Sequence, residues 1–253
     1  GATTGVAESE LIRVAALSLG LSDVVAFDPA KKIIEGLFHG EDRLASMSVK
    51  AFAEELAADC PAPGGGSAAA LAGGLGAGLV AMVASLSHAK KGFESRKGEL
   101  ESLGVEAHRL LAGGLEAGDA DAAAFSRLMS ASRLPAQTKD ERAAREKAVR
   151  AAGKEAARVP LETLARVPAA LELARRAAEK GSPSAFSDAG VAASLLRAAA
   201  LGAYYNVLIN LPGISDAAWR RKTRASADRE LAAALKKSAA LEKAVLKKLR
   251  AAA

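Results

Sequence analysis

A stretch of about twenty residues without a charged side chain, Ser67–Ser87, limits the folds open to this chain more than any other feature. It is rich in Ala and Gly, is long enough to span a bilayer, and contains the spacing Gly74-x-x-x-Gly78 found between membrane helices. However, it lacks interfacial Trp and Tyr, and Ala and Gly gain little from contact with lipid. Because the other segments are amphipathic, we interpret this stretch as a helix buried within a soluble bundle and expect no membrane partner.

The composition predicts that the rest of the chain is helical as well. Half of the 253 residues are hydrophobic, but aromatic residues make up only 4%. The apolar residues are mainly Ala and Leu, which are strong helix formers, and the β-branched runs typical of strands are scarce. We therefore predict an all-α fold, a multi-helix bundle around a central, buried helix rich in Gly and Ala.

The charge of the chain is mildly positive. Its formal net charge is +6, with 35 Lys and Arg against 29 Asp and Glu, which suits a nucleic-acid binder, a membrane-surface protein or an enzyme with an anionic substrate. A basic run near the C-terminus is interpreted as the solvated face of a terminal helix; it consists of Lys236, Lys237, Lys243, Lys247, Lys248 and Arg250. No nucleic-acid partner is expected, because aromatic residues are not interleaved with these charges. The single cysteine, Cys60, excludes an internal disulfide and fits a reducing cytoplasm, and no signal peptide opens the chain.

Caps and breaks divide the chain into two predicted segments. Residues 1–46 are expected to form an N-terminal helical tail and linker, with helices at residues 9–19 and after Asp28, and residues 47–253 the main domain. Helices of the main domain are predicted to begin near Ser48, Ser67, Glu94, Thr138, Asp188 and Asp216. Pro160 and Pro168 are expected to kink or divide the helix that Gly181 ends.

The glycines before the charge-free stretch have two interpretations. Gly64, Gly65 and Gly66 can form a permissive loop that Ser67 ends as the N-cap of the helix. Alternatively, free N–H groups at the positive end of the helix bind an anion or a polar ligand edge. The Lys-Ser/Thr of a Walker loop is missing, so we do not expect nucleotide binding.

Two aspartates, Asp119 and Asp121, occur in the middle of a predicted helix, where Asp is unfavourable. At 100° per residue they fall on opposite flanks of the apolar stripe and cannot act as a pair. The flank of Asp121 is the more apolar, since it also carries Leu110, Gly114, Phe125 and Leu128. Burial there would raise the pKa of Asp121 toward the range that a general acid or base needs. The alternative is a solvated or ion-paired aspartate. The three histidines and Cys60 have no metal-ligand spacing, and we expect no metal site.

Three separated stretches resemble the formimidoyltetrahydrofolate cyclodeaminase family, which includes methenyltetrahydrofolate cyclohydrolase-like members. They are Pro63-Gly-Gly-Gly-Ser67 with its helix, Asp119-Ala-Asp121-Ala-x-x-Phe125 followed by Arg133-Leu-Pro135, and Ser187-Asp188 with Gly202-Ala-Tyr-Tyr-Asn-Val-Leu-Ile-Asn-Leu211. The region around Phe27-Asp-Pro29 is similar to the segment that joins a formimidoyltransferase to this domain in bifunctional enzymes. An upstream formimidoyltransferase domain is therefore a possible partner.

The resemblance implies an all-α homodimer or larger oligomer that acts in histidine degradation. It implies conversion of 5-formimidoyltetrahydrofolate to 5,10-methenyltetrahydrofolate and ammonia, with no metal or redox cofactor. The family's catalytic aspartate corresponds to Asp121, which would accept the N10 proton and return it to the departing nitrogen. Lys90 and Lys91 correspond to a basic pair, although Ala89 stands where the family has glycine.

The resemblance also implies contacts to the substrate. Lys90, Lys91 and Arg133 would hold the glutamate tail, single or polyglutamylated. Asp188 is either an N-cap or a contact to the donor edge of the pterin, and Asn206 and Asn210 either bind the pterin or tie neighbouring helices. The full predicted substrate-binding set is Gly64, Gly65, Gly66, Ser67, Lys90, Lys91, Asp119, Arg133, Asp188, Asn206 and Asn210.

Two other functions stay open at this point. One is hydrolysis of 5,10-methenyltetrahydrofolate, which passes through the same tetrahedral carbon. The other belongs to a different class, a non-catalytic helical module for interaction or membrane association.

Overall fold

A computed structural model describes Val14, residues 44–60 and residues 62–252 of the chain. The helices expected at residues 9–19 and after Asp28 lie outside the described residues, apart from Val14. The chain divides into two compact units, Gly1–Gly64 and Gly65–Ala253.

The described part of the first unit holds a short 3-10 helix, Leu44–Ser46, and α4, Val49–Ala57. The hydroxyl oxygen of Ser48 accepts a hydrogen bond from the backbone N–H of Ala51 at 3.1 Å, so Ser48 is the N-cap that the sequence predicts. No residue of α4 is buried.

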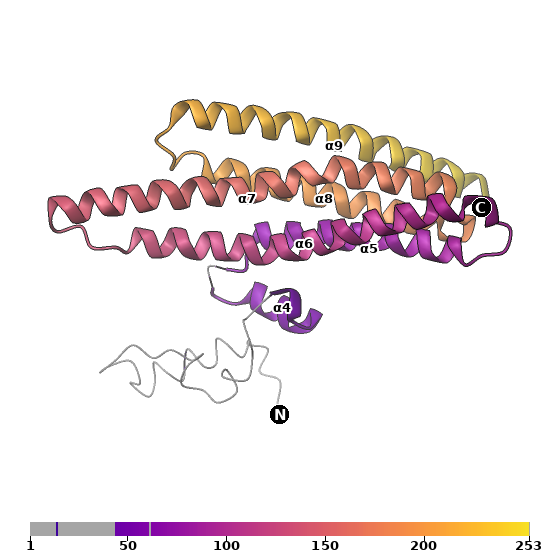
Figure 1. Ribbon diagram of the computed structural model, residues 1–253, viewed down its shortest axis with the longest axis horizontal. Helices are drawn as coiled ribbons and strands as arrows, with labels where there is room; N and C mark the ends of the chain where they lie inside the picture. The colour runs from indigo at the N-terminus through magenta and orange to yellow at the C-terminus, as the bar shows by residue number, and fades with distance from the viewer. Residues whose placement is uncertain (1–13, 15–43, 61, 253) are drawn as a thin grey trace. The chain divides into compact units, whose positions relative to one another are not determined.

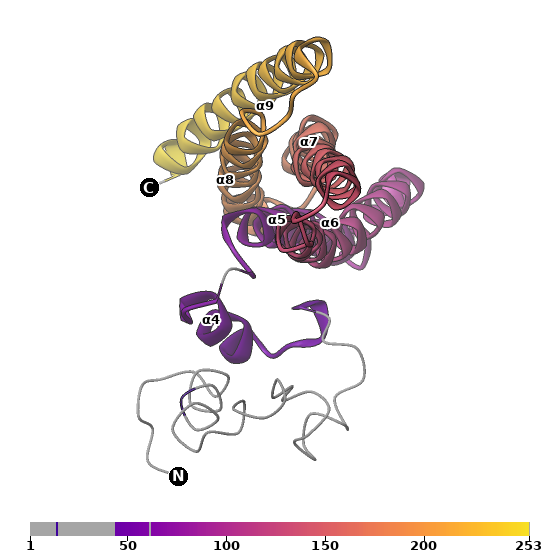
Figure 2. The same cartoon turned by 90° about the vertical axis from the view of Figure 1, so that its left-hand side faces the viewer.

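The second unit is a bundle of long helices, as Figure 1 shows: α5 (Gly65–His88), α6 (Lys97–Ser132), α7 (Lys139–Lys180), α8 (Phe186–Asn210) and α9 (Ala217–Ala252). Two 3-10 helices, Glu94–Arg96 and Pro183–Ala185, precede α6 and α8. Figure 2 shows α7 and α8 between α9 and the pair α5 and α6. The predicted all-α bundle is confirmed.

Close approach between backbones holds α5 against its neighbours. A Cβ atom placed on Gly114 of α6 would lie 2.7 Å from the Cα atom of Gly74 on α5. A Cβ atom on Gly202 of α8 would lie 2.8 Å from the Cβ atom of Ala69. Side chains do not fit at such distances, so the small residues of α5 let α6 and α8 pack directly on its backbone.

The leucines of α5 lie on its other face. Leu75 and Leu86 are 51% and 55% exposed, and they belong to a helical stripe with Leu71, Leu79 and Met82. The helix is therefore buried on one side and not on all sides. By length and composition alone, α5 and the segment Pro183–Asn210 could cross a membrane, but 50% and 39% of their apolar windows are buried within the fold.

Pro160 and Pro168 do not divide α7, because the helix continues through both of them, so that part of the prediction is wrong. Proline has no N–H, so Pro160 leaves the carbonyl group of Ala156 without its usual helical partner. The side-chain amide of Asn210 donates a hydrogen bond to that carbonyl oxygen at 2.9 Å. A contact from α8 thus replaces the missing bond inside α7.

The first turn of α7 forms as the sequence predicts. The backbone N–H of Glu141 donates to the hydroxyl oxygen of Thr138 at 3.2 Å, and the Glu141 carboxylate accepts from the backbone N–H of Thr138 at 2.9 Å. Two other helices begin earlier in the chain than the sequence predicts. Helix α5 begins at Gly65 and not at Ser67, and α8 begins at Phe186 and not at Asp188.

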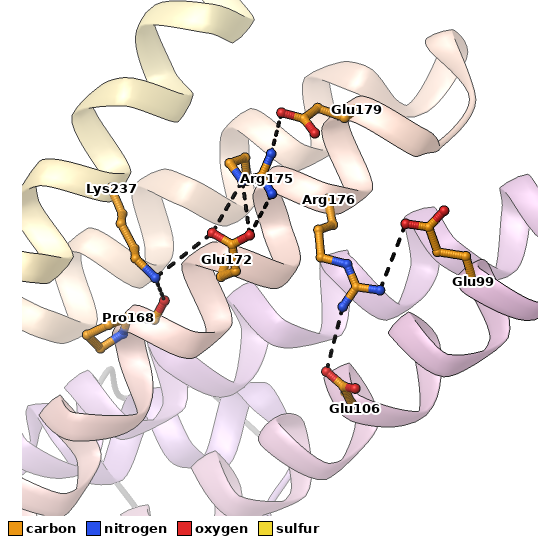
Figure 3. Close-up of polar contacts among 8 residues, drawn as sticks. All are labelled: Glu99, Glu106, Pro168, Glu172, Arg175, Arg176, Glu179 and Lys237. Carbon is orange, nitrogen blue, oxygen red and sulfur yellow. Dashed lines mark hydrogen bonds and ion pairs between the residues drawn. The ribbon is translucent and has the colours of Figure 1, made fainter. Parts of the chain in front are cut away.

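Ion pairs join the outer surfaces of α6, α7 and α9 (Figure 3). Arg176 lies 4.0 Å from Glu99 and 3.9 Å from Glu106, both on α6. Lys237 of α9 lies 3.9 Å from Glu172 and donates a hydrogen bond to the carbonyl of Pro168 at 2.9 Å. Exposed pairs of this kind contribute about 0–1 kcal/mol each, so packing of the small residues dominates.

We expect Gly114→Ala to lower the free energy of unfolding by about 1–3 kcal/mol, because the added methyl group would overlap the α5 backbone. Gly98→Ala in the same helix is the matched control. A Cβ atom there meets nothing within 4 Å, and alanine favours the helix by up to about 1 kcal/mol. Urea unfolding of both variants measures the difference. Equal stabilities would contradict the close approach.

Candidate functional site

Asp121 of α6 lies against the first turn of α5. The hydroxyl group of Ser67 donates a hydrogen bond to Oδ2 of Asp121 at 3.0 Å. A Cβ atom on Gly66 would lie 2.5 Å from the Cγ atom of Asp121, so only glycine leaves room for the carboxyl group. The side chain of Asp121 is half-buried. Of the predicted residues, Gly66, Ser67 and Asp121 therefore form one cluster.

Ser67 is fully buried within α5 and is not its N-cap. Its hydroxyl oxygen lies 3.0 Å from Oδ2 of Asp121 and 3.2 Å from the carbonyl oxygen of Gly118. A serine hydroxyl has one proton, so it can donate fully to only one of these acceptors at a time. Since the hydroxyl has no access to solvent, Ser67 acts on Asp121 and not directly on a ligand.

Two opposing effects set the pKa of Asp121. Burial raises the pKa because it penalises the charged carboxylate, and this is the larger effect. Hydrogen bonds from the hydroxyl and the backbone N–H of Ser67 stabilise the carboxylate and oppose the rise. The net pKa is raised above the ordinary value for aspartate. The direction of this shift is the one that a proton-exchanging carboxyl group needs.

Asp119 is also half-buried, and one of its carboxylate oxygens is inaccessible to solvent. It is two residues from Asp121, which places the two side chains about 200° apart around α6. The structure therefore keeps them on different faces of the helix, as the sequence predicts. Only Asp121 contacts the first turn of α5.

Asn206 and Asn210 lie at the end of α8 that reaches the start of α5. The amide nitrogen of Asn206 would lie 3.6 Å from a Cβ atom on Gly65, and it donates to the carbonyl of Gly202 at 2.8 Å. Asn210 uses its amide N–H groups for the carbonyls of Ala156 and Asn206, at 2.9 and 2.8 Å. These bonds favour the helix-tying interpretation for Asn210, whereas Asn206 borders the candidate site.

Other predicted residues lie far from Asp121 in this chain. Lys90 and Lys91 follow the opposite end of α5, a helix of 24 residues and about 36 Å. Lys90 donates a hydrogen bond to the hydroxyl of Ser182 at 2.8 Å, and Asp188 lies nearby in sequence at the start of α8. Arg133 is the C-cap of α6, about 18 Å along the axis from Asp121. Gly64, in contrast to these residues, directly precedes α5 and is the last residue of the first unit.

Comparison with known proteins assigns the family. Residues 48–229 match the family described as formiminotransferase-cyclodeaminase. The chain belongs to this family. The rat formimidoyltransferase-cyclodeaminase is 34% identical over 220 residues, which are 86% of this chain and 41% of the rat protein. The chain thus spans about two fifths of the length of that relative.

Two further relatives are closer to this chain in length. The methenyltetrahydrofolate cyclohydrolase of Methylorubrum extorquens is 34% identical over 174 residues, 68% of this chain and 83% of that protein. The crystal structure of a formiminotetrahydrofolate cyclodeaminase from Thermotoga maritima superimposes with a TM-score of 0.71 at 27% identity. It covers 81% of this chain and 98% of its own.

Two features of the site were missed at the level of sequence. The first is the carbonyl of Gly118, which shares the Ser67 hydroxyl with Asp121. The second is the bond between Asn210 and Ala156, which could have been suspected from Pro160, since a proline inside a helix frees the carbonyl four residues earlier. No group of three His, Cys, Asp or Glu side chains is arranged to hold a metal ion within the described residues.

The raised pKa of Asp121 predicts a stability difference that depends on pH. The folded chain keeps the proton of the Asp121 carboxyl group to a higher pH than the unfolded chain does. In an unfolded chain an aspartate titrates at about pH 3.9. Its favourable contribution is complete below that pH and is lost as the pH rises through the folded pKa. We expect Asp121→Asn, which does not titrate, to gain stability relative to the unsubstituted chain over this window. Urea unfolding from about pH 4 to pH 8 measures the difference. A difference that is constant or moves the other way would contradict a raised pKa.

Proposed function

We propose that this chain converts 5-formimidoyltetrahydrofolate to 5,10-methenyltetrahydrofolate with release of ammonia, and that Asp121 moves the proton. The observation that carries the proposal is the half-buried carboxyl group of Asp121 against Gly66 and Ser67, with its raised pKa. Its place in a chain of the formiminotransferase-cyclodeaminase family supports the choice of substrate.

The reaction requires one proton to move twice. N10 of the folate attacks the carbon of the formimidoyl group, whose imino nitrogen is protonated, and a new bond between N10 and carbon forms. The Asp121 carboxylate accepts the proton that N10 loses and then returns it to the amino nitrogen on the tetrahedral carbon. The bond between carbon and this nitrogen breaks, ammonia leaves, and the positive charge of the methenyl product is shared by N5 and N10. A carboxyl group with a raised pKa suits both transfers, because it is a stronger base toward N10 than an ordinary aspartate and, once protonated, can pass the proton on.

Ser67 can serve both protonation states of Asp121. When Asp121 is charged, the Ser67 hydroxyl donates to it across 3.0 Å. When Asp121 holds the proton, the hydroxyl can turn to the carbonyl of Gly118 at 3.2 Å. The free N–H groups at the start of α5 also favour the charged carboxylate through the positive end of the helix. These contacts hold the carboxyl group in place through the cycle.

A second candidate function is hydrolysis of 5,10-methenyltetrahydrofolate to the 10-formyl compound. The similarity to the Methylorubrum extorquens cyclohydrolase favours it, because that relative matches over 83% of its own length. Water would attack the same carbon, Asp121 would accept its proton, and the bond to N5 would break. Supplying each substrate and following the methenyl absorbance distinguishes the two functions. Cyclodeamination forms the methenyl compound and releases ammonia, whereas hydrolysis consumes the methenyl compound and releases no ammonia.

We expect Asp121→Asn to lower the turnover of 5-formimidoyltetrahydrofolate at least about 100-fold, since general acid–base groups contribute this much or more. Folding and folate binding should persist, because asparagine keeps the shape of the side chain. Ammonia release and methenyl absorbance measure turnover. Glu116→Gln, an exposed charge change on the same helix, is the matched control and should leave turnover intact. Normal turnover by Asp121→Asn would exclude the role of Asp121.

We also propose that two copies of the chain associate, and that the outward aliphatic face of α5 takes part. This face presents Leu75 and Leu86, which are more than half exposed, on a helix with no Lys, Arg, Asp or Glu. A twofold axis across α5 would cover the face on both copies at once. Light scattering should give at least twice the mass of one chain, and Leu75→Glu should lower it. A single-chain mass for the unsubstituted protein would contradict the proposal.

A further inference from the structure

Helices α6 and α7 continue past the level at which α5 starts and α8 ends. Ser67 near the start of α5 contacts Asp121, but α6 runs on to Ser132. Asn210 at the end of α8 contacts Ala156, but α7 begins as early as Lys139. Figure 1 shows this pair of helices projecting from the bundle. We call residues 122–153 the arm.

One face of α6 extends from Asp121 to the tip of the arm. On α6, Asp121, Phe125, Leu128 and Ser132 follow one another at helical spacing, and all four are half-buried. Asp121 and Ser132 are eleven residues apart, which is three turns and about 16 Å. Arg145 and Ala156 on α7 are also eleven residues apart and therefore share a face.

The two faces meet in a pocket at the tip of the arm. The pocket has a volume of about 380 Å³ and is lined by Ser132, Ala136, Arg142, Arg145, Glu146 and Val149. Glu146 is paired with Arg150 at 2.5 Å. Arg142 donates to the carbonyls of Ala136 and Gln137 at 3.3 and 2.7 Å. Arg145 has neither a hydrogen bond nor an ion pair with any residue in the described part of the chain, so its guanidinium group is available to a ligand.

The arm is also positively charged. It has seven Lys and Arg residues against three Asp and Glu, a net charge of +4. An anionic ligand is therefore attracted to the arm. Phe125 and Leu128 lie between the carboxyl group of Asp121 and the arginines, where they could contact an aromatic ring of the ligand.

We infer that the arm binds the aminobenzoylglutamate part of the folate, with the aromatic ring beside Phe125 and a glutamate carboxylate on Arg145. The inference rests on the proposed function, because it takes Asp121 as the group beside N10. It deepens that function by giving the substrate a direction, from the first turn of α5 toward the tip of the arm. Arg145 becomes a residue for substrate affinity that neither the sequence motifs nor the basic pair Lys90 and Lys91 indicated.

The test compares two substrates, 5-formimidoyltetrahydrofolate and the analogue that lacks the glutamate. Arg145→Gln should raise KM for the glutamate-bearing substrate about tenfold, the loss expected for a charge-assisted hydrogen bond, with kcat within about twofold. For the analogue, KM should be the same with and without the substitution. Lys147→Gln is the matched control, because it removes the same charge from an exposed residue about 200° around α7.

Three results would overturn the inference. They are an unchanged KM in Arg145→Gln, an equal loss for both substrates, which a general folding defect would also produce, and an equal loss in Lys147→Gln. Direct binding separates the inference from the proposed function. Calorimetry with p-aminobenzoylglutamate and p-aminobenzoate needs no turnover. The first compound should bind more weakly to Arg145→Gln, and the second should bind both proteins alike.

Discussion

The close approach of α5 to α6 is the constraint on which the rest of the structure depends. Gly74 and Gly114 bring the two backbones together, and Gly66 continues the same contact face to the carboxyl group of Asp121. A methyl group on Gly114 would overlap the α5 backbone, and one on Gly66 would overlap the carboxyl group of Asp121. The contact that builds the core therefore also sets the surroundings of Asp121, because the carboxyl group lies where a side chain on α5 would otherwise be. Stability and proton chemistry share one interface in this fold.

Within that interface, burial and hydrogen bonding act on Asp121 in opposite directions. Burial favours the neutral acid, while the Ser67 hydroxyl and the start of α5 favour the carboxylate. Because the two effects oppose each other, the pKa of Asp121 rises less than burial alone would raise it. A stronger donor than Ser67 would hold the carboxylate too firmly, and a drier site would hold the acid. The balance comes from one hydroxyl group with two acceptors.

Local features of this fold could be predicted from sequence, and distances between elements could not. The capping box at Thr138 and the flank of Asp121 are set by neighbours within a few residues, and both are as expected. Lys90 follows the helix that begins beside Asp121, yet the length of α5 carries it to the other end of the bundle. The sequence also does not show that α6 and α7 extend beyond the start of α5. That difference depends on where α5 starts relative to the neighbours it packs against, which only the folded chain specifies.

The bond between Asn210 and Ala156 has a consequence for how α7 and α8 find their register. The buried faces of these helices are largely Ala and Leu, so sliding one helix by a turn would replace many contacts with similar ones. A free carbonyl in the middle of a helix is rare, and Pro160 creates one. Asn210 reaches this carbonyl in the observed alignment, and sliding by one turn would leave it without a partner. Pro160 thus marks a position along a helix whose apolar surface would otherwise accept several.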